Sequence, residues 1–362
     1  MTGITAFIYH PDYLRYQFGP SHPFKPIREK YTLDLLRELR VFDGKVKYYE
    51  PTPANEEDLL LVHSKEYVDF VKRMCEQGYG YLDYGDTPAI KGLYEGACSV
   101  VGGSILGAKL LMDGDVSHAF NPGGGLHHAK QDSASGFCVF NDVAITTRFL
   151  KKTYGLKKIA IVDVDGHHGD GTQEILYSEP VLKISTHRIG IFPGTGYVDE
   201  VGVNAGKGYS VNIPLPRGAD DKAYLYAFNE VVPPLIEMYK PEMIINQFGV
   251  DGHYQDPLVG LALTTGIYQE VSRIIHDLAH KFSGGKLLIL GGGGYNVHNT
   301  TRCWATMFVT VSEALPETSK KKYRELLDKK ILIPNRGALD TVRKTVEKIK
   351  RDIFPIHGLA SF

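Results

Sequence analysis

Residues 159–173, IAIVDVDGHHGDGTQ, pass abruptly from an apolar run to five ionisable side chains. Asp163 and Asp165 are two positions apart, so extended geometry would place them on one face, and His167 follows two positions later. A carboxylate and an imidazole at this spacing can hold one divalent cation, and both Zn²⁺ and Fe²⁺ accept such mixed donors. Burying so many charges is costly unless they are paired or metal-bound, so the segment predicts a metal site rather than a surface turn.

Asp251 is the candidate for a third ligand. A catalytic zinc ion needs three protein ligands and an open position for water. Asp251 follows the apolar run 243–248 in the sequence GVDGHYQDPL, and it would emerge at the same edge of a sheet as Asp165. We therefore expect Asp165, His167 and Asp251 to share one cation.

A second histidine pair, His127 and His128, follows the strand-like run SHAFN and a glycine turn. Two histidines beside a metal suit general acid/base catalysis, because imidazole titrates near neutral pH and a carboxylate partner tunes it. Asp163 and Asp170 are available as such partners. Standing alone, the dipeptide would be better explained as a packed or exposed pair.

Short apolar runs alternate with amphipathic segments along the chain. The runs 158–162, 181–185, 243–248 and 286–290 are typical of strands covered on both faces. The segments between them predict helices at 142–154, 219–239 and 266–281. This alternation predicts an α/β fold with a central parallel sheet and helices on both faces. No linker or repeat interrupts it, so we expect a single domain over residues 1–362.

Two further helical segments are predicted outside this alternation. Residues 52–58 provide a capping residue followed by acids, and they lead into a helical pattern over 59–74. Residues 320–352 are basic and helical in pattern, and we expect the C-terminal segment 320–362 to pack on the domain as a solvated docking helix.

Glycine runs lie just after the strand candidates, at 122–125, 193–196 and 291–294. Loops at the carboxyl ends of parallel strands carry the sites of α/β proteins, and glycine there lets backbone approach a ligand closely. None of these runs has the spacing of a phosphate-binding loop or of a dinucleotide fingerprint. We therefore do not expect nucleotide binding.

The composition limits the classes of partner. The chain has 362 residues with 41 Lys and Arg against 42 Asp and Glu, a net charge of −1. This balance argues against direct nucleic-acid binding and against an anionic membrane surface. No signal peptide or apolar run of about 18 residues is apparent, and we expect a cytoplasmic protein. Cysteines occur without a pairing pattern and are expected to be reduced core residues: Cys75, Cys98, Cys138 and Cys303.

Seven motifs together resemble the zinc-dependent histone deacetylase family, which has the arginase/deacetylase fold, and within it the prokaryotic acetoin-utilisation type close to class I. They occur in the family's order and cover most of the chain. The motifs are HPFKPIR at 22–28, NPGGGLHHA at 121–129, SGFCVFND at 135–142, DVDGHHGDG at 163–171, FPGTG at 192–196, VDGHYQDPL at 250–258 and GGGGYN at 291–296.

The resemblance implies a role for each matching residue in amide hydrolysis. The zinc ligands would be Asp165, His167 and Asp251. The acid/base pair would be His127 and His128, backed by Asp163 and Asp170, and the Tyr295 hydroxyl would polarise the substrate carbonyl. A potassium ion beside the zinc loop would be held by oxygens of Asp163, Asp165, His167, Ser185 and Thr186.

The same resemblance implies a tunnel for the aliphatic stem of an acyl-lysine. Its walls would be Phe137 and Phe192, and Gly136 and Leu258 would complete the lining. Asp86 would grip the substrate backbone at the mouth. Arg28 matches an arginine of an inner channel.

Several alternatives stay open at this point. An acetylated protein or peptide is the expected substrate, and small acetylated polyamines are the alternative; the short segment 76–92 leaves no room for the dimer-building loop of polyamine enzymes. A binuclear arginase-like hydrolase is poorly supplied with ligands, because Gly169 and His253 occupy two of its ligand positions, although His253 could still ligate. An inactive binding module is disfavoured because every expected catalytic residue is present. The sequence does not determine the oligomeric state.

Overall fold

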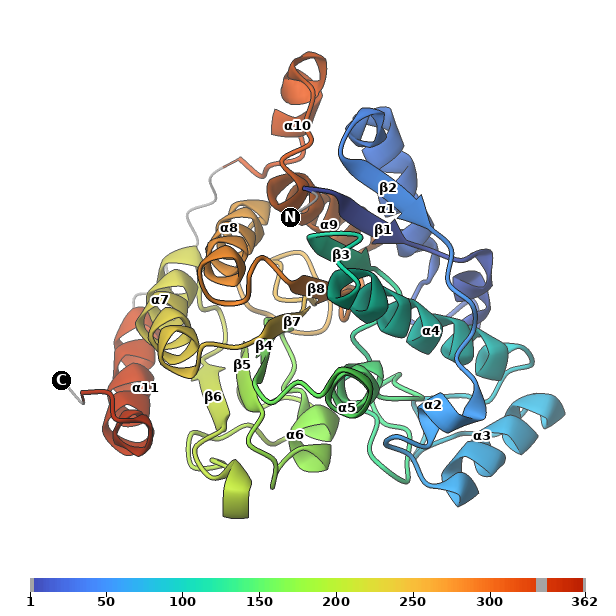
Figure 1. Cartoon of the computed structure of the whole chain (residues 1–362), viewed down its shortest axis with the longest axis horizontal. Helices are drawn as coiled ribbons and strands as arrows, with labels where there is room; N and C mark the ends of the chain where they lie inside the picture. Colours follow the sequence, from blue (N-terminus) through green and yellow to red (C-terminus); the bar gives the residue numbers. More distant parts are fainter. Residues whose placement is uncertain (1–2, 330–336, 361–362) are drawn as a thin grey trace.

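Eight parallel strands form one sheet in the order β2-β1-β3-β8-β7-β4-β5-β6 (Figure 1). The computed structural model describes residues 3–329 and 337–360. The central strands are fully buried, which explains their continuous Val, Ile and Leu content. The strands are β1 (Thr5–Ile8), β2 (Val46–Tyr49), β3 (His118–Asn121), β4 (Ile159–Asp163), β5 (Leu182–Arg188), β6 (Ser210–Leu215), β7 (Met243–Gln247) and β8 (Leu287–Leu290).

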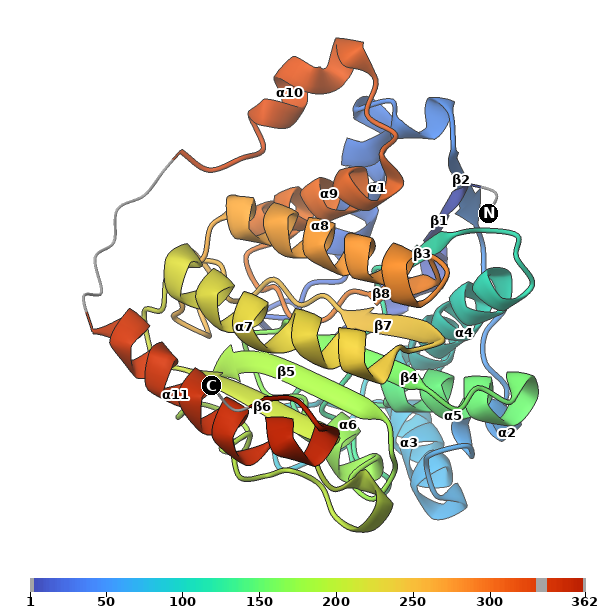
Figure 2. The same cartoon turned by 60° about the vertical axis from the view of Figure 1, so that its left-hand side comes forward.

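Helices cover both faces of the sheet. On one face α11, α7, α8, α9 and α1 pack against one another in this order, and on the other α4 packs on β3, β8 and α5 (Figures 1 and 2). This arrangement confirms the predicted α/β fold. The helices are α1 (Ile27–Glu38), α2 (Glu56–Leu59), α3 (Lys65–Gln77), α4 (Leu93–Met112), α5 (Asp142–Tyr154), α6 (Asp170–Ile175), α7 (Asp221–Tyr239), α8 (Thr265–Phe282), α9 (Val297–Ser312), α10 (Lys320–Arg324) and α11 (Ala338–Asp352).

The strand order brings the chemically interesting loops together. Asp163 at the end of β4 pairs with Gln247 at the end of β7, so the loops that carry Asp165 and Asp251 start side by side. Asn121 at the end of β3 pairs with Leu290 at the end of β8, so the loops leading to His127 and Tyr295 also start side by side. All four loops leave the same edge because the strands are parallel.

The single helix predicted after residues 52–58 is wrong, because the structure contains two. Asn55 caps α2, and Asp58 completes a capping box with it. The chain then turns, and Ser64 starts α3 by accepting a hydrogen bond from the backbone N–H of Tyr67. Val62 and His63 are buried in the intervening turn, so tertiary packing ends the first helix there.

Helix α4 is the one described helix whose length and apolar character would suit a membrane span. It is 78% buried within the protein. It packs on β3 and β8 and against α5, so its apolar character is that of a helix inside the core.

Helix α11 packs on α7 and β6 through Val342, Val346 and Ile349, and its other face is exposed. This observation is consistent with the expected docking helix. Residues 330–336 and 361–362 of the predicted C-terminal segment lie outside the described residues. The assignment of the whole chain to one domain stays a prediction.

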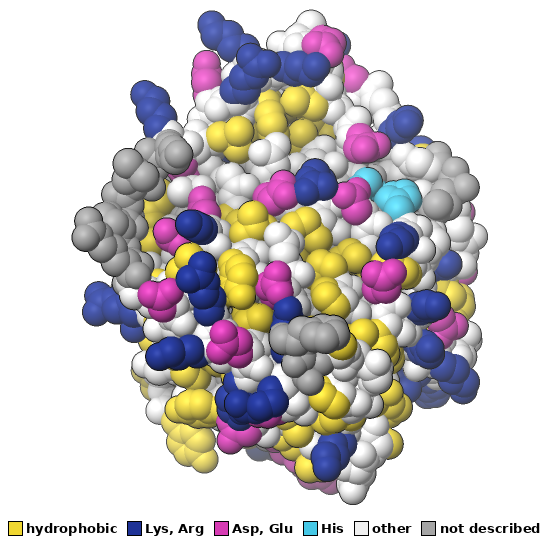
Figure 3. Space-filling view, turned by 90° about the vertical axis from the view of Figure 1, so that its left-hand side faces the viewer, with side chains coloured by type: hydrophobic (Ala, Val, Ile, Leu, Met, Phe, Trp, Pro, Cys, Tyr) yellow, Lys and Arg dark blue, Asp and Glu magenta, His cyan; other side chains and the backbone are white. Residues whose placement is uncertain are grey.

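Basic and acidic side chains are interspersed on the face drawn in Figure 3. This distribution follows from the nearly equal numbers of the two charge types in the sequence. It lacks the clustered positive charge that phosphate backbones require.

Trp304 connects this packing to the site, because its indole Nε1 donates to the backbone oxygen of Phe248 at 2.9 Å. Trp304→Phe leaves that buried carbonyl unpaired, which should lower the free energy of unfolding by about 1–3 kcal/mol. Tyr31→Phe, at a residue that is 49% exposed, should change it by less than about 0.5 kcal/mol. Urea denaturation followed by circular dichroism tests both variants, and equal midpoints would contradict the expectation.

Candidate metal centre and active site

Asp165, His167 and Asp251 lie together and are buried, with one potential ligand atom from each within 4.8 Å of the other two. Nδ1 of His167 is 2.7 Å from Oδ2 of Asp251 and 3.4 Å from Oδ1 of Asp165. The first two residues lie in the loop from β4 to α6, and Asp251 follows β7. The structure therefore brings the three predicted metal ligands together.

Neighbouring donors fix the orientation of both carboxylates. Oδ2 of Asp165 accepts hydrogen bonds from the backbone N–H of Gly293 at 2.7 Å and from Nε2 of Gln247 at 2.9 Å. Oδ1 of Asp251 accepts from the backbone N–H of Gly166 at 2.6 Å. A Cβ atom on Gly293 would collide with the Asp251 carboxylate, so this glycine is required for the close approach of backbone.

The electrostatics of the three groups favour a bound cation. Burial and the neighbouring Asp165 carboxylate raise the pKa of Asp251 to about 6. Burial alone would lower the pKa of His167, but Asp251 and Asp165 raise it to about 10. Two carboxylates and an imidazole are a donor set that suits a divalent ion such as Zn²⁺ and that this ion would neutralise.

His127 and His128 lie beside this cluster, each paired with a carboxylate. Nδ1 of His127 donates to Asp163 and Nδ1 of His128 donates to Asp170, both at 2.7 Å. The two Nε2 atoms are 3.1 Å apart. The carboxylates thus fix the protonated nitrogen of each ring, as expected for oriented acid/base groups.

The two imidazoles have opposite pKa shifts. Burial would lower the pKa of His127, but the nearby Asp163 and Asp165 raise it to about 9. Burial and the adjacent His127 lower the pKa of His128 to about 4. At neutral pH His128 is therefore neutral and able to accept a proton, while His127 is positively charged.

A cavity of about 240 Å³ leads from the surface to the cluster. It opens past Asp86 and reaches His128 and His167. Five of the residues predicted to bind the substrate line it. Its lining consists of Asp86, His128, Gly136, Phe137, His167, Ile191, Phe192, Leu258 and Tyr295.

The wall at Gly136 and Phe137 has a demanding backbone conformation. Phe137 has φ of +66°, which is unusual for a residue with a side chain. The Tyr16 hydroxyl donates to its backbone oxygen at 2.7 Å, and its N–H donates to Thr87 Oγ1 at 3.2 Å. These hydrogen bonds hold the strained residue in place and aim its ring into the cavity.

Tyr295 lines the inner part of the cavity, with its ring centroid 6.3 Å from that of His167. Burial and the carboxylates of Asp251 and Asp165 raise the pKa of its phenol well above the ordinary value. The hydroxyl is therefore protonated at neutral pH and able to donate a hydrogen bond.

The comparisons with known proteins agree with this geometry. A family profile described as the histone deacetylase domain matches residues 22–311. The chain belongs to the histone deacetylase family. It is a hydrolase of the deacetylase type, with the fold expected from its motifs.

Related proteins support the assignment over most of the chain. The deacetylase is 40% identical to the acetoin utilization protein AcuC of Bacillus subtilis over 317 residues, 84% of this chain and 81% of AcuC. It is 36% identical to a probable deacetylase of Archaeoglobus fulgidus over 353 residues, 96% of this chain and 97% of that protein. The crystal structure of the HDA15 HD domain matches with a TM-score of 0.82 and 30% identity, covering 98% of each chain.

Arg28 and His253 lie outside the cavity of the deacetylase. Arg28 is buried and donates to the backbone oxygen of Gly294 at 2.8 Å, directly before Tyr295. Its predicted channel role stays a prediction. Nε2 of His253 pairs with Asp328 at 2.8 Å, away from the three metal-ligand candidates. Within residues 3–329 and 337–360, His253 therefore gives no support to an arginase-like second metal.

The residues predicted to hold potassium lie near one another. Asp163 on β4 pairs in register with Ser185 on β5, and Thr186 follows on the same strand. A small space of about 20 Å³ is lined by both Asp163 and Ser185. This volume accommodates about one water-sized species.

Three supporting residues of the deacetylase were not predicted from its sequence. Asp142 accepts hydrogen bonds from the backbone N–H of Gly125 and Leu126, so it positions the turn before His127. Asp256 accepts from the backbone N–H of Tyr295 at 2.8 Å, and Gln247 orients Asp165. Asp142 and Asp256 occur in the quoted motifs, but only the folded loops show what they bind.

Substituting Gly136 with Ala should obstruct the cavity, because a Cβ atom there would lie 2.6 Å from His128 and 2.7 Å from Phe192. We expect kcat/KM for an acetylated substrate to fall by about 10²-fold, a loss typical of misplacing groups around the reacting atoms. Gly155→Ala is a matched control, since it shares a positive φ but has open space around it. Equal activity of the two variants would contradict the tunnel assignment.

Proposed function

We propose that this deacetylase is a zinc-dependent lysine deacetylase that removes acetyl groups from acetyl-lysine side chains of proteins. The observation that carries the proposal is the narrow cavity between Phe137 and Phe192, which ends at His128, His167 and Tyr295. An aliphatic stem fits between two aromatic walls, and the amide it carries would reach the polar end. This matches the shape of an acyl-lysine better than that of a branched or bulky substrate.

The proposed metal ligands are Asp165, His167 and Asp251. A bound Zn²⁺ would polarise the amide oxygen and lower the pKa of its water, and Fe²⁺ suits the same donors. The fit rests on the burial and convergence of the two carboxylates and the imidazole.

Different side chains around these ligands would carry out the separate proton transfers. His128 lines the cavity, and because its Nδ1 donates to Asp170, its Nε2 carries the lone pair that would accept a proton from the attacking water. The protonated phenol of Tyr295 donates to the developing oxyanion. A protonated histidine of the His127–His128 pair then donates to the departing amine. The products are acetate and a free lysine side chain.

A protein or peptide substrate is supported by the mouth of the cavity. Phe192 and Asp86 also line an outer cavity of about 440 Å³, together with the exposed Tyr84. A peptide backbone can lie in this outer space while one side chain enters the tunnel. The acidic Asp83 and Asp86 at the same mouth would also attract a cationic acetylated polyamine, which is the second candidate substrate.

A monovalent cation is part of the proposal. We propose potassium beside Asp163 and Ser185, with Asp165, His167 and Thr186 as its other predicted neighbours. The small space lined by Asp163 and Ser185 supports this position. Such an ion would offset a carboxylate that the zinc ion does not contact.

We also propose that the enzyme works in the cytoplasm, without direct contact to nucleic acid or membrane. All four cysteines are buried and free, as expected of a reducing compartment. The nearly equal numbers of basic and acidic residues, and their interspersed arrangement on the face drawn in Figure 3, support the proposal that nucleic acid is not a direct partner.

The experiment that tests the substrate is acetate release from an acetyl-lysine peptide and from acetylputrescine, each with and without a chelator. We expect chelator-sensitive turnover with higher kcat/KM for the peptide. Preference for acetylputrescine would assign the enzyme to the polyamine class. Absence of turnover of both, with the metal bound, would contradict the proposal.

Tyr295→Phe should remove the oxyanion donor without disturbing the metal ligands. The expected result is a kcat about 10²-fold lower, with metal content and KM nearly unchanged, because the lost hydrogen bond forms in the transition state. Steady-state kinetics and elemental analysis measure the two quantities. An unchanged kcat would show that another group polarises the carbonyl.

Asp86→Asn should weaken peptide binding. The side chain proposed to accept hydrogen bonds from the backbone N–H groups of the substrate can then no longer carry a negative charge. We expect KM for the peptide to rise about tenfold with kcat nearly constant, since a hydrogen bond to a charged group contributes about 1.5–3 kcal/mol. N-butylacetamide has the aliphatic stem but no backbone amides, so its KM should stay the same. Equal effects on both substrates would contradict the backbone-binding role.

A further inference from the structure

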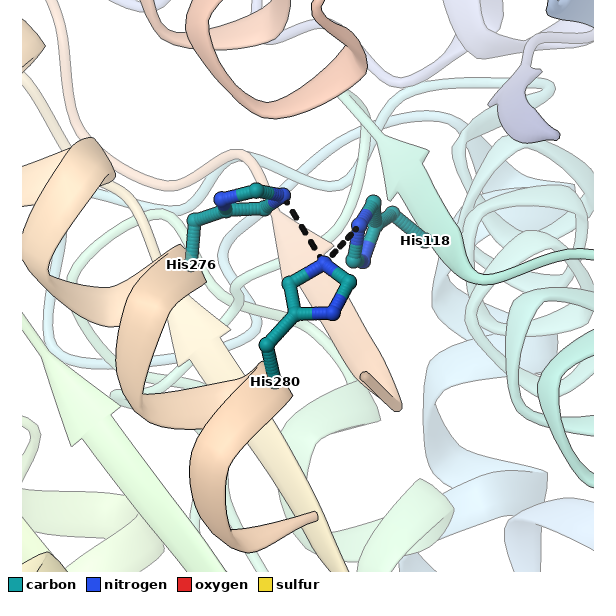
Figure 4. A group of neighbouring side chains, drawn as sticks. All are labelled: His118, His276 and His280. Carbon is teal, nitrogen blue, oxygen red and sulfur yellow. Dashed lines mark hydrogen bonds between the residues drawn. The ribbon is translucent and has the colours of Figure 1, made fainter. Parts of the chain in front are cut away.

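Three histidines from two distant parts of the sequence converge at the edge of the sheet opposite the active site. His118 begins β3, and His276 and His280 lie near the end of α8 (Figure 4). Nε2 of His280 is 3.2 Å from Nε2 of His118 and 3.1 Å from Nε2 of His276. The three ligand atoms all lie within 4.8 Å of one another.

This geometry matches the arrangement of imidazoles around one metal ion. His276 and His280 are four positions apart, so they lie on one face of α8, a spacing that metal-binding helices use. With Zn–N distances of about 2.0–2.1 Å, neighbouring nitrogens of a tetrahedral site are roughly 3.3–3.4 Å apart. The two measured separations are within about 0.3 Å of this value.

Hydrogen bonding among the three rings does not explain both the contact of His280 with His118 and its contact with His276. Nε2 of a neutral imidazole has either one N–H or one lone pair. Nε2 of His280 faces Nε2 of both His118 and His276, so only one of the two contacts can be a well-directed hydrogen bond. One cation between the rings would use the lone pairs of all three nitrogens.

The surroundings favour neutral imidazoles and a nearby cation. His118 is buried at the start of β3, where the neutral imidazole that binds metals is favoured over the charged form. Oδ1 of Asp277 lies 3.9 Å from Nδ1 of His276, so a negative charge is close to the cluster. His280 is in the last turn of α8, where the helix dipole also favours positive charge.

We propose that His118, His276 and His280 form a second site for a divalent cation of the class that prefers imidazole ligands, such as Zn²⁺, Ni²⁺ or Cu²⁺. The three Nε2 atoms are the ligands, and water completes the coordination. The ion connects the C-terminal end of α8 to the start of β3. The site lies at the opposite end of β3 from the loop that carries the acid/base pair, so it does not depend on the proposed function.

Metal content per chain tests the site with Zn²⁺ as the probe. The full-length protein is equilibrated by dialysis against micromolar Zn²⁺, and bound zinc is measured by elemental analysis. We expect about two zinc ions per chain for the wild type and about one for the His276→Ala/His280→Ala variant, with kcat/KM unchanged when the remaining site is loaded. His298→Ala, at an exposed histidine of α9, is the matched control and should keep two.

The outcomes separate this site from the catalytic one. Asp251→Ala should keep the ion at the histidine site and lose the other. Equal zinc content in the wild type and in the His276→Ala/His280→Ala variant would overturn the proposal and leave the three rings as a packing cluster. Both substituted residues are at least partly exposed, and circular dichroism verifies that the variant is folded.

Discussion

Asp165 and Asp251 are fully buried carboxylates on adjacent loops, and their mutual repulsion is the constraint on which the active site depends. Like charges interact strongly in a medium of low dielectric constant, so this pair is stable only with positive charge and N–H donors around it. His167 contacts both carboxylates, while Gly293 and Gln247 donate to Asp165. Glycine is required where backbone approaches this closely. A divalent cation would supply further positive charge to the same arrangement.

The sheet makes this concentration of charge possible. Because β4 lies next to β7, and β3 next to β8, four loops meet at one edge, and together they carry the residues proposed for catalysis. The proposed metal ligands come from two of them, the proposed acid/base pair from a third and Tyr295 from the fourth. The tunnel wall at Phe137 is added outside this layer and is held by hydrogen bonds of Tyr16 and Thr87. The residues proposed for catalysis thus follow directly after buried strands, and those proposed for substrate selection lie on longer loops.

The sequence predicts the elements well where one physical signal dominates. Continuous apolar runs locate β4, β5, β7 and β8 to within a few residues, and the motifs name the residues that the structure places around the cavity. Strand order cannot be derived from periodicity, so the sequence alone did not reveal what Asp142 and Asp256 bind. The turn before Ser64 was missed because burial, rather than helix propensity, ends α2. In the histidine cluster of β3 and α8, His118 lies 158 positions before His276, and only the fold brings the two segments together.

The most direct test of the metal-centred account compares Asp251→Ala with its parent in a His276→Ala/His280→Ala background, where one zinc site is expected. Bound zinc and acetate release from an acetyl-lysine peptide are measured on the same samples. The account predicts about one zinc ion and turnover for the parent, and neither for the Asp251→Ala protein. Full zinc occupancy together with undiminished acetate release after the loss of Asp251 would contradict it.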